Sequence, residues 1–454
     1  MKRAAIALVT LGVAIGGALT APLHDAEAQR IDPRRPRVLV VGAPPGASPM
    51  QRIDARRTGL SKTTLPSGTL RVAWQKTTGL TIDQPALSGA DGTLAVVSVR
   101  GDVSFLDDEG EERATVKVGV AQVGPAAMTS DGTVVYMTSG GDVIGVRRSS
   151  AQPRFLTRIG GERNVRAAPL ALDDGGVVVA TTTDLVVLDS EGNVRARVSL
   201  PEMPAAPLIA AGDKVLAVTT SGAVLGWTPG REPVRLGSFG APIDGGAALA
   251  DGGTLLAVIE GNHLAEVDIT RGGRSTRSIA TQGLYLGPPA IRSGRATAQA
   301  RASVATLLAL TPSRGFVVTL DPGGQELFRA PIAAFTPAAL PDGGAPPLVA
   351  PPHTGPIVDA RGAIAFAATD GRVGVVGPEG AVDTIGEVLC AKGARSGVVG
   401  LTPFGNGAFA VTCDGGVVAR ITGASVERSR PAPQPPGSAD PSRLRPAPRD
   451  SVGD

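Results

Sequence analysis

The sequence predicts an all-β protein, an eight-bladed β-propeller of four-stranded antiparallel blades. Eight times, an apolar run of five to eight residues ends in a tight turn and is followed by a second short apolar strand. Successive turns lie 39 to 56 residues apart, which is close to the period of a four-stranded blade. The chain is rich in Gly (61) and Pro (38), and no long amphipathic helical stretch follows residue 20. A seven-bladed ring with one degenerate unit is the alternative.

The turn residues of the repeats form a column that suits positive φ, which Gly adopts freely and Asn tolerates. An aliphatic residue stands two positions after each turn, beginning with Val103 and ending with Val417. Thr183 departs from the column, and we expect a differently typed turn there beside Asp184. The other positions of the column are Gly101, Gly141, Gly222, Asn262, Gly315, Gly371 and Gly415.

The strands before these turns are nearly continuous apolar runs, as in residues 93–99, which indicates burial on both faces between neighbouring blades. The last repeat ends near Thr422 without an outer strand of its own, whereas residues 69–77 form a spare strand at the front. Pairing the two would remove both open edges of the ring. We therefore expect the N-terminal strand to close the last blade.

The first 28 residues are typical of a secretory signal peptide. Lys2 and Arg3 precede an apolar stretch over residues 4–19, and Ala26-Glu27-Ala28 offers a cleavage site. An uncleaved membrane anchor is the alternative, although about 20 apolar residues are usual for a span. No cysteine follows the apolar stretch, so a lipid anchor of the bacterial lipoprotein type is not expected. We predict a periplasmic or secreted protein with no integral membrane span after cleavage.

The remaining chain divides into three parts by composition. Residues 29–66 are Arg- and Pro-rich and are expected to be a flexible lead-in, residues 67–424 form the propeller, and residues 425–454 form a disordered Pro/Arg-rich tail. Two insertions, at residues 292–301 and 333–353, interrupt the repeats and are expected on opposite faces. They carry function, or they are length variation without a role.

The chain has two cysteines, Cys390 and Cys413, both near the last repeat. An even pair in an exported chain favours a disulfide over a catalytic thiol.

The segment from Asp54 to Ser61, the strand around Trp74, and blades ending in Gly-x-Val-x-x-Leu-Asp resemble the pyrroloquinoline-quinone-like repeat propellers. The best copy is Gly101 to Asp107, and the resemblance covers about residues 50–422. This family includes periplasmic quinoprotein dehydrogenases and a non-catalytic outer-membrane assembly lipoprotein. The repeat implies the fold and says little about activity.

An enzyme of this family would need a quinone pocket, calcium and an Asp base, and would carry an adjacent cysteine pair and tryptophan-docking repeats. The adjacent cysteines are missing, and the chain has only two tryptophans. His263 and His353 are distant, and the acidic run 107–112 lacks the ligand spacing of a calcium loop. We therefore expect no catalytic, cofactor-binding or metal-binding residues and no cofactor.

The net charge of +3 and a pI near 9.1 come largely from arginines in the flanking segments, so nucleic-acid binding is not expected. The function that we predict is an exported, non-catalytic, monomeric propeller that serves as a protein-interaction platform in the bacterial envelope, with unknown envelope partners. The alternatives are a quinone-dependent dehydrogenase-like cofactor binder and a polysaccharide-binding module. The latter would need exposed aromatic side chains, and aromatic residues make up 3% of the chain.

Overall fold

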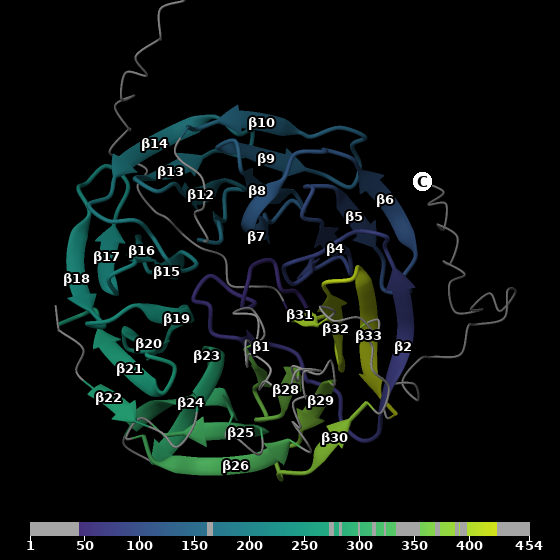
Figure 1. Ribbon diagram of the computed structural model, residues 1–454, viewed down its shortest axis with the longest axis vertical. Coiled ribbons are helices and arrows are strands. Elements are labelled where there is room, and N and C mark those ends of the chain that lie inside the picture. Colours follow the sequence, from purple (N-terminus) through teal and green to yellow (C-terminus); the bar gives the residue numbers. More distant parts are fainter. Residues whose placement is uncertain are drawn as a thin grey trace, which may run out of the picture.

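The structure is a computed structural model that describes residues 45–160, 167–271, 277–280, 284–297, 300–310, 315–321, 324–332, 355–367, 373–385, 390 and 397–424. In these residues every regular element is a β-strand. The strands form separate sheets that follow one another around a ring (Figure 1). The predicted all-β propeller is therefore confirmed.

Seven sheets are four-stranded and antiparallel, and six of these consist of four consecutive strands. The first three are β3 (Leu87–Ser88), β4 (Leu94–Val97), β5 (Val103–Leu106) and β6 (Glu112–Val116); β7 (Gln122–Met128), β8 (Val134–Thr138), β9 (Asp142–Val146) and β10 (Phe155–Arg158); and β11 (Leu170–Ala171), β12 (Val177–Ala180), β13 (Asp184–Leu188) and β14 (Val194–Ser199). The next three are β15 (Ile209–Ala211), β16 (Lys214–Val218), β17 (Ala223–Trp227) and β18 (Val234–Ser238); β19 (Ile243–Leu249), β20 (Thr254–Ile259), β21 (His263–Asp268) and β22 (Arg277–Ala280); and β23 (Leu284–Thr297), β24 (Ala300–Leu310), β25 (Gly315–Leu320) and β26 (Glu326–Ile332).

The seventh four-stranded sheet closes the ring, because its outer strand comes from the front of the chain. It contains β2 (Leu70–Thr77), β31 (Val398–Pro403), β32 (Ala408–Cys413) and β33 (Val417–Gly423). Strand β2 pairs antiparallel with β33 from Leu70↔Gly423 to Thr77↔Val417. The predicted closure of the last blade by the N-terminal strand is confirmed.

One further sheet differs from the seven four-stranded blades. It has five strands, β1 (Leu60–Ser61), β27 (Ile357–Asp359), β28 (Ile364–Ala367), β29 (Val373–Val376) and β30 (Val382–Thr384). Strand β1 pairs in parallel with β27, and the other neighbours are antiparallel. The structure therefore shows seven four-stranded blades, and the predicted count of eight blades is not confirmed.

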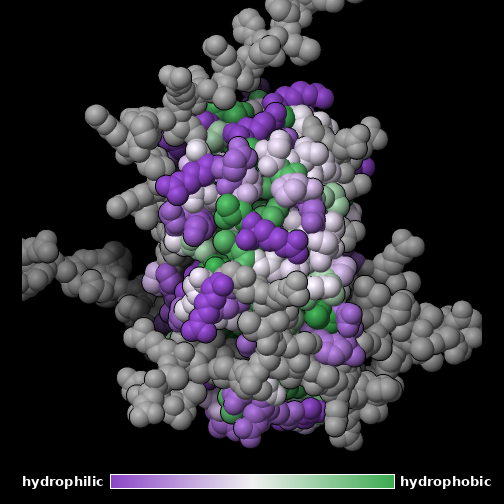
Figure 2. Space-filling view, turned by 90° about the vertical axis from the view of Figure 1, so that its left-hand side faces the viewer, coloured by the Kyte–Doolittle hydropathy of each residue, from purple (hydrophilic) through white to green (hydrophobic). Residues whose placement is uncertain are grey.

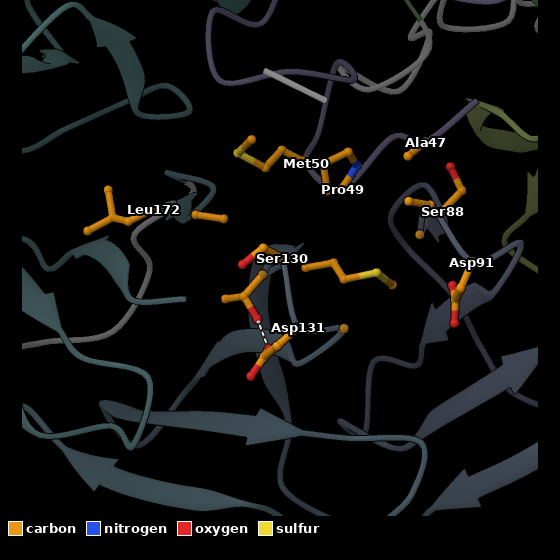
Figure 3. A pocket seen from close by; sticks show the side chains of 14 residues that line it. Ala47, Pro49, Met50, Ser88, Asp91, Ser130, Asp131 and Leu172 are labelled. Atoms are coloured by element: carbon orange, nitrogen blue, oxygen red, sulfur yellow. Dashed lines mark hydrogen bonds between the residues drawn. The ribbon is translucent and has the colours of Figure 1, made fainter. Parts of the chain in front are cut away.

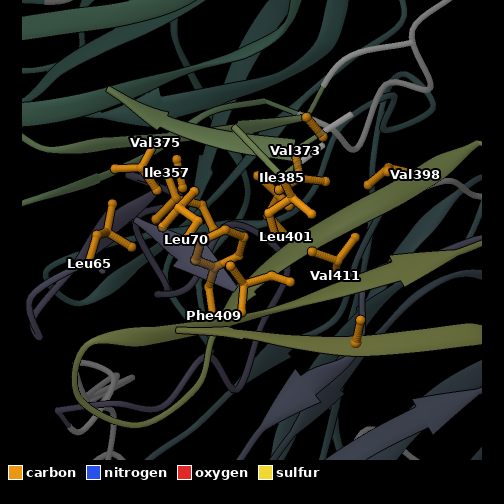
Figure 4. Close-up of a cluster of buried hydrophobic side chains, with 14 of the residues drawn as sticks. Leu65, Leu70, Ile357, Val373, Val375, Ile385, Val398, Leu401, Phe409 and Val411 are labelled. Atoms are coloured by element: carbon orange, nitrogen blue, oxygen red, sulfur yellow. The ribbon is translucent and has the colours of Figure 1, made fainter. Parts of the chain in front are cut away.

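The core lies between neighbouring blades. The second and third strands of the first sheet, β4 and β5, are buried at every position, as expected for strands covered on both faces. Figure 4 shows the cluster between the last two sheets, where Phe409 and Val411 of β32 face Ile357 of β27 and Val375 of β29. Leu65 and Leu70, which lie before or within the closing strand, belong to the same cluster. Closure therefore buries apolar surface as well as a strand edge.

Three residues of the turn column have the predicted positive φ: Gly101, Gly141 and Gly222, each at 80°. At the corresponding turn of the last blade, between β32 and β33, the residue with positive φ is Gly416 (82°), the neighbour of Gly415. At Asn262 the turn uses Glu260 (51°) and Gly261 (69°) instead. Gly315 is the first residue of β25, and Gly371 lies outside the described residues. At the Thr183 turn, the hydroxyl of Thr181 accepts hydrogen bonds from the amides of residues 183 and 184.

The predicted insertion at 292–301 is an extension of the β23–β24 hairpin, with pairing continuing to Thr297↔Ala300. The predicted insertion at 333–353 lies outside the described residues, as do residues 1–28, 29–44 and 425–454. The flexible lead-in predicted over 29–66 is wrong for residues 45–66, which pack inside the ring. Their burial and hydrogen bonds come from contacts with distant strands, which local composition does not encode.

The predicted disulfide is present between Cys390 and Cys413, whose Cα atoms are 5.6 Å apart. Both cysteines are 1% exposed and lie in the cluster between the last two sheets.

Replacing both cysteines with serine is expected to lower the free energy of unfolding by about 3 kcal/mol, because the cross-link restricts a loop of the unfolded chain. Urea unfolding of the oxidised chain and the double variant measures the difference. Reduced wild-type chain is the control and should match the double variant within about 1 kcal/mol. Equal stability of oxidised and reduced chains would show that the cross-link contributes nothing.

Candidate functional site

The centre of the ring at one end is occupied by residues 46–65 of the chain itself, which we call the strap. The strap is the purple segment inside the ring in Figure 1. It lies where the innermost strands of the blades end, and we call this end the strap face. Its backbone meets seven sheets through bonds from Gly405 N to Gly46 O (3.2 Å), Ser48 N to Ser88 O (3.0 Å), Met128 N to Pro49 O (2.6 Å), Ala210 N to Ala55 O (2.8 Å), Leu249 N to Arg56 O (2.9 Å), Ile291 N to Thr58 O (2.7 Å), Val358 N to Gly59 O (2.9 Å) and Gly407 N to Thr64 O (2.9 Å).

A tight bend in the strap is organised by Asp54. One carboxylate oxygen accepts the amides of Arg56 (3.1 Å) and Thr58 (3.0 Å), and the other accepts the Thr58 hydroxyl (2.6 Å). This pattern satisfies backbone donors where no ladder is available. Left-handed φ is uncommon outside glycine and needs such support from the surroundings. Three residues of the bend adopt it: Arg52 (64°), Ile53 (78°) and Arg57 (58°).

Arg57 fixes the strap to two neighbouring sheets. Its side chain is 1% exposed and donates to the carbonyls of Leu208 (2.9 Å), Pro169 (2.8 Å), Ala168 (3.4 Å) and Gln51 (2.9 Å). Ala168 and Pro169 precede β11, and Leu208 precedes β15. One guanidinium therefore joins the strap to the starts of two blades.

Arg52 does the same for another part of the ring. It donates to the carbonyls of Pro356 (2.7 Å), next to β27, and Pro289 (2.8 Å), within β23. Desolvation by burial lowers the pKa of both Arg52 and Arg57 to about 10, and the nearby carboxylate of Asp54 opposes the shift. Both side chains are therefore cations at neutral pH, and carbonyl dipoles replace their hydration.

A cleft of about 370 Å³ opens on the strap face beside the strap. Pro49 and Met50 of the strap line one part of the cleft (Figure 3), and turns of the first three sheets line the rest. Leu172 lies on one side of the cleft, and Ser88 and Asp91 lie on the other. Its complete lining is Ala47, Pro49, Met50, Ser88, Gly89, Ala90, Asp91, Met128, Thr129, Ser130, Asp131, Gly132, Ala171 and Leu172. The cleft combines a methionine-rich floor with a polar rim, which suits an apolar side chain of a ligand or partner.

The residues that the sequence singled out for chemistry do not come together. His263 begins β21, and its Nδ1 lies 3.8 Å from a carboxylate oxygen of Glu260, while His353 lies outside the described residues. In the acidic run 107–112, Asp107 accepts the amides of Glu109 and Glu111 at a hairpin tip. Within the described residues, no group of three or more His, Cys, Asp or Glu side chains is placed to hold a metal ion.

The family resemblance implies a quinone and a calcium ion near the ring centre. Calcium prefers several carboxylate, amide and carbonyl oxygens around one point. The strap instead carries the cations of Arg52 and Arg57 at the ring centre, and their nitrogens donate to carbonyls of the blades. The cationic side chains of Arg52 and Arg57 at the ring centre therefore do not fit a calcium ion.

Both tryptophans of the chain are engaged in internal contacts. Trp74 of β2 donates to the carbonyl of Asp108 (2.9 Å) and packs edge-on against Phe404, with ring centroids 6.4 Å apart. Trp227 is 1% exposed and donates to the carbonyl of Arg231 (3.0 Å). These rings stabilise blades rather than offering stacking platforms.

The sequence did not reveal the strap or the cleft. The segment Asp54 to Ser61 resembles the family, but its Arg-rich composition predicts a flexible lead-in. The available signal was the alternation of Ile53, Ala55 and other apolar residues with arginine inside that matched segment. Within the part of the chain that the structure describes, no helix is long and apolar enough to cross a lipid bilayer.

No protein-family model matches the chain, and no curated protein matches it in sequence. The solved structures similar to it include BamB from Moraxella catarrhalis, with 18% identity, a TM-score of 0.52, and coverage of 78% of this chain and 98% of BamB. A europium-containing methanol dehydrogenase matches with 12% identity and a TM-score of 0.53, covering 81% of this chain and 90% of that one. The quinohemoprotein alcohol dehydrogenase ADHIIG from Pseudomonas putida HK5 matches with 12% identity and a TM-score of 0.55, covering 88% and 85%.

These similarities support the resemblance to the pyrroloquinoline-quinone-like repeat propellers at the level of the fold. The neighbours include BamB as well as two proteins named as dehydrogenases, and a shared fold does not select between binding and catalysis.

Proposed function

We propose that this chain is an exported, non-catalytic β-propeller that acts as a protein-interaction platform in the bacterial cell envelope. The observation that carries the proposal is the strap, which fills the ring centre at one end with the chain's own buried residues. A propeller whose centre is occupied in this way presents its faces and side wall for binding. The similarity in fold to BamB agrees with this role.

The outer surface is suited to protein contacts rather than to a single catalytic pocket. Leu156, Val194, Val234 and Leu327 are large apolar residues of outer strands that are 41–58% exposed. Figure 2 shows the side wall that carries β18, where small groups of hydrophobic residues lie between hydrophilic ones. Non-obligate protein interfaces are about as apolar as the rest of a protein surface, so this mixed surface is compatible with partner binding.

Export and processing remain part of the proposal. The first 28 residues would direct the chain across the membrane, and cleavage after Ala28 would leave a periplasmic or secreted monomer that begins at Gln29. The five-stranded sheet of β1 and β27–β30 would serve as the eighth blade, with β1 added by the strap. The Cys390–Cys413 disulfide agrees with an oxidising compartment.

The proposal predicts that the folded chain, residues 29–454, captures a specific envelope protein from detergent-solubilised envelope extract. The comparison is a chain without residues 333–353, because that insertion is the longest interruption of the repeats. Thermally unfolded chain on the same resin is the control for non-specific binding. Capture by folded but not unfolded chain supports a platform, and loss of capture in the deletion variant places the interface on the insertion.

A different pair of results would contradict the platform proposal. If the folded chain captures nothing above the unfolded control, and a calorimetric titration with pyrroloquinoline quinone and calcium shows stoichiometric binding, the platform proposal fails. The chain would then be a cofactor binder of the dehydrogenase type.

A further inference from the structure

The cleft on the strap face owes its opening to one missing side chain. In six sheets the residue after, or at the end of, the innermost strand donates its amide to the carbonyl four residues later. Among these six described residues, five carry a side chain and the sixth is Gly89. The bonds run from Gly89 to Thr93 (2.8 Å), Thr129 to Thr133 (2.9 Å), Leu172 to Gly176 (2.9 Å), Ala250 to Thr254 (2.8 Å), Asp359 to Ala363 (2.9 Å) and Phe404 to Ala408 (3.3 Å).

The backbone at Gly89 does not require glycine, because its φ lies outside the left-handed region. A Cβ there would lie 2.7 Å from Oδ1 of Asp91 and 3.2 Å from Sδ of Met128. A side chain would therefore occupy the space between the apolar floor and the acidic rim. Glycine at this position keeps that space open.

The floor of the cleft is apolar and adaptable. Met50, Met128 and Leu172 are 2%, 3% and 6% exposed. Met50 belongs to the strap, Met128 ends β7, and Leu172 follows β11. Methionine side chains are flexible and polarizable, so they adjust to different apolar partners. A volume of about 370 Å³ is at the lower end for ligand pockets, which suits one large side chain and its flanks.

The charged residues in the lining are two aspartates, Asp91 and Asp131. The Asp131 carboxylate is already bound by Arg147 and by Arg154, the latter at 2.6 Å. Asp91 has a side chain that is 59% exposed. Its carboxylate accepts the amide (3.1 Å) and the hydroxyl (2.8 Å) of Thr93, and its contact with Arg148 is longer, at 3.7 Å. Asp91 is therefore the carboxylate of the rim that an incoming cation reaches.

We propose that this cleft binds an extended peptide segment of a protein partner, with one large aliphatic side chain on the methionine floor and an adjacent lysine or arginine at Asp91. This inference rests on the proposed platform function and names the chemistry of the partner. The strap supplies part of the floor, so the cleft exists only when the strap is packed inside the ring.

The test uses a synthetic ten-residue peptide with one leucine between two lysines in a Gly/Ser background. Methyl NMR of the mature chain, labelled at its methionine methyl groups, reports binding directly. The methyl signals of Met50 and Met128 should shift on titration, whereas those of Met137 and Met203, which do not line the cleft, should not. Peptides with leucine replaced by serine, or lysines replaced by glutamate, should bind at least about tenfold more weakly, equivalent to about 1.4 kcal/mol.

Two variants of the chain make the test specific. Gly89→Val fills the cleft and should reduce affinity about tenfold or more, and Asp91→Asn should reduce it about threefold to tenfold. Asp213→Asn, which alters an exposed carboxylate in the β15–β16 turn outside the cleft, should leave affinity unchanged. Thermal unfolding of each variant checks that the fold is retained. Absence of Met50 and Met128 shifts, or equal binding by wild type and Gly89→Val, overturns the proposal.

The envelope capture experiment separates this inference from the platform function. If Gly89→Val retains the protein captured by the wild-type chain, the platform stands and the cleft is not its binding site. If the wild-type chain captures nothing, the platform function itself fails.

Discussion

Replacing Arg57 with methionine is expected to lower the free energy of unfolding by about 3–5 kcal/mol. The substitution removes the donor to carbonyls of Gln51, Ala168, Pro169 and Leu208 and leaves these oxygens buried without that partner. Methionine keeps most of the side-chain volume, so the loss reflects the hydrogen bonds rather than a cavity. Urea unfolding followed by tryptophan fluorescence gives the difference in stability.

The neighbouring Arg56 provides the matched control. It is 39% exposed and pairs with Asp251, which is 41% exposed, at 2.7 Å. Exposed ion pairs contribute about 0–1 kcal/mol, so Arg56→Met should have a much smaller effect. Equal losses in the two variants would show that Arg57 has no special part in holding the strap.

Gly222→Ala is the second substitution with a large expected effect, a loss of about 3 kcal/mol or more. Gly222 has a φ of 80°, and a Cβ there would collide with the carbonyl oxygen of Ala241 in the connection to the next blade. The turn and the connection would both have to move. Thermal and urea unfolding of the variant measure the cost.

Gly212→Ala separates conformational strain from collision. Gly212 has a φ of 63°, but nothing lies within 4 Å of the Cβ it would gain. Its replacement should cost only the strain of the left-handed conformation, about 1 kcal/mol. If both variants lose the same stability, the close approach of Gly222 to Ala241 is not a constraint on the fold.

The repeats, the closure and the disulfide could be predicted because each depends on a local or pairwise pattern. Gly101 and Gly222 mark turns that recur with the blade period, residues 69–77 supply a strand without a partner, and Cys390 has one possible partner in the chain. Such signals can be recognised in the sequence without knowledge of distant contacts. The structure confirms the antiparallel pairing of β2 with β33 and the disulfide between Cys390 and Cys413.

The strap could not be predicted because its stability comes from partners that are distant in sequence. Arg52 and Arg57 occur in an Arg/Pro-rich stretch, and such composition normally indicates solvated, mobile chain. Only the ring brings carbonyls such as those of Pro356 and Leu208 around them. The cleft could not be predicted for the same reason, because the space beside Gly89 is bounded by Met50 and Met128, which are distant in sequence.

The most direct test of a propeller centred on its own strap is hydrogen–deuterium exchange of residues 46–65, measured with and without pyrroloquinoline quinone and calcium. The strap amides of Ser48 and Leu65, which donate to Ser88 and Asp359, should exchange as slowly as those of the innermost strands. The blade amides that donate to strap carbonyls, such as those of Met128 and Ala210, should be equally protected, and the additives should leave the pattern unchanged. Exchange within seconds in the free chain, or a change in strap protection when quinone and calcium are added, would contradict a ring whose centre is filled by the chain itself.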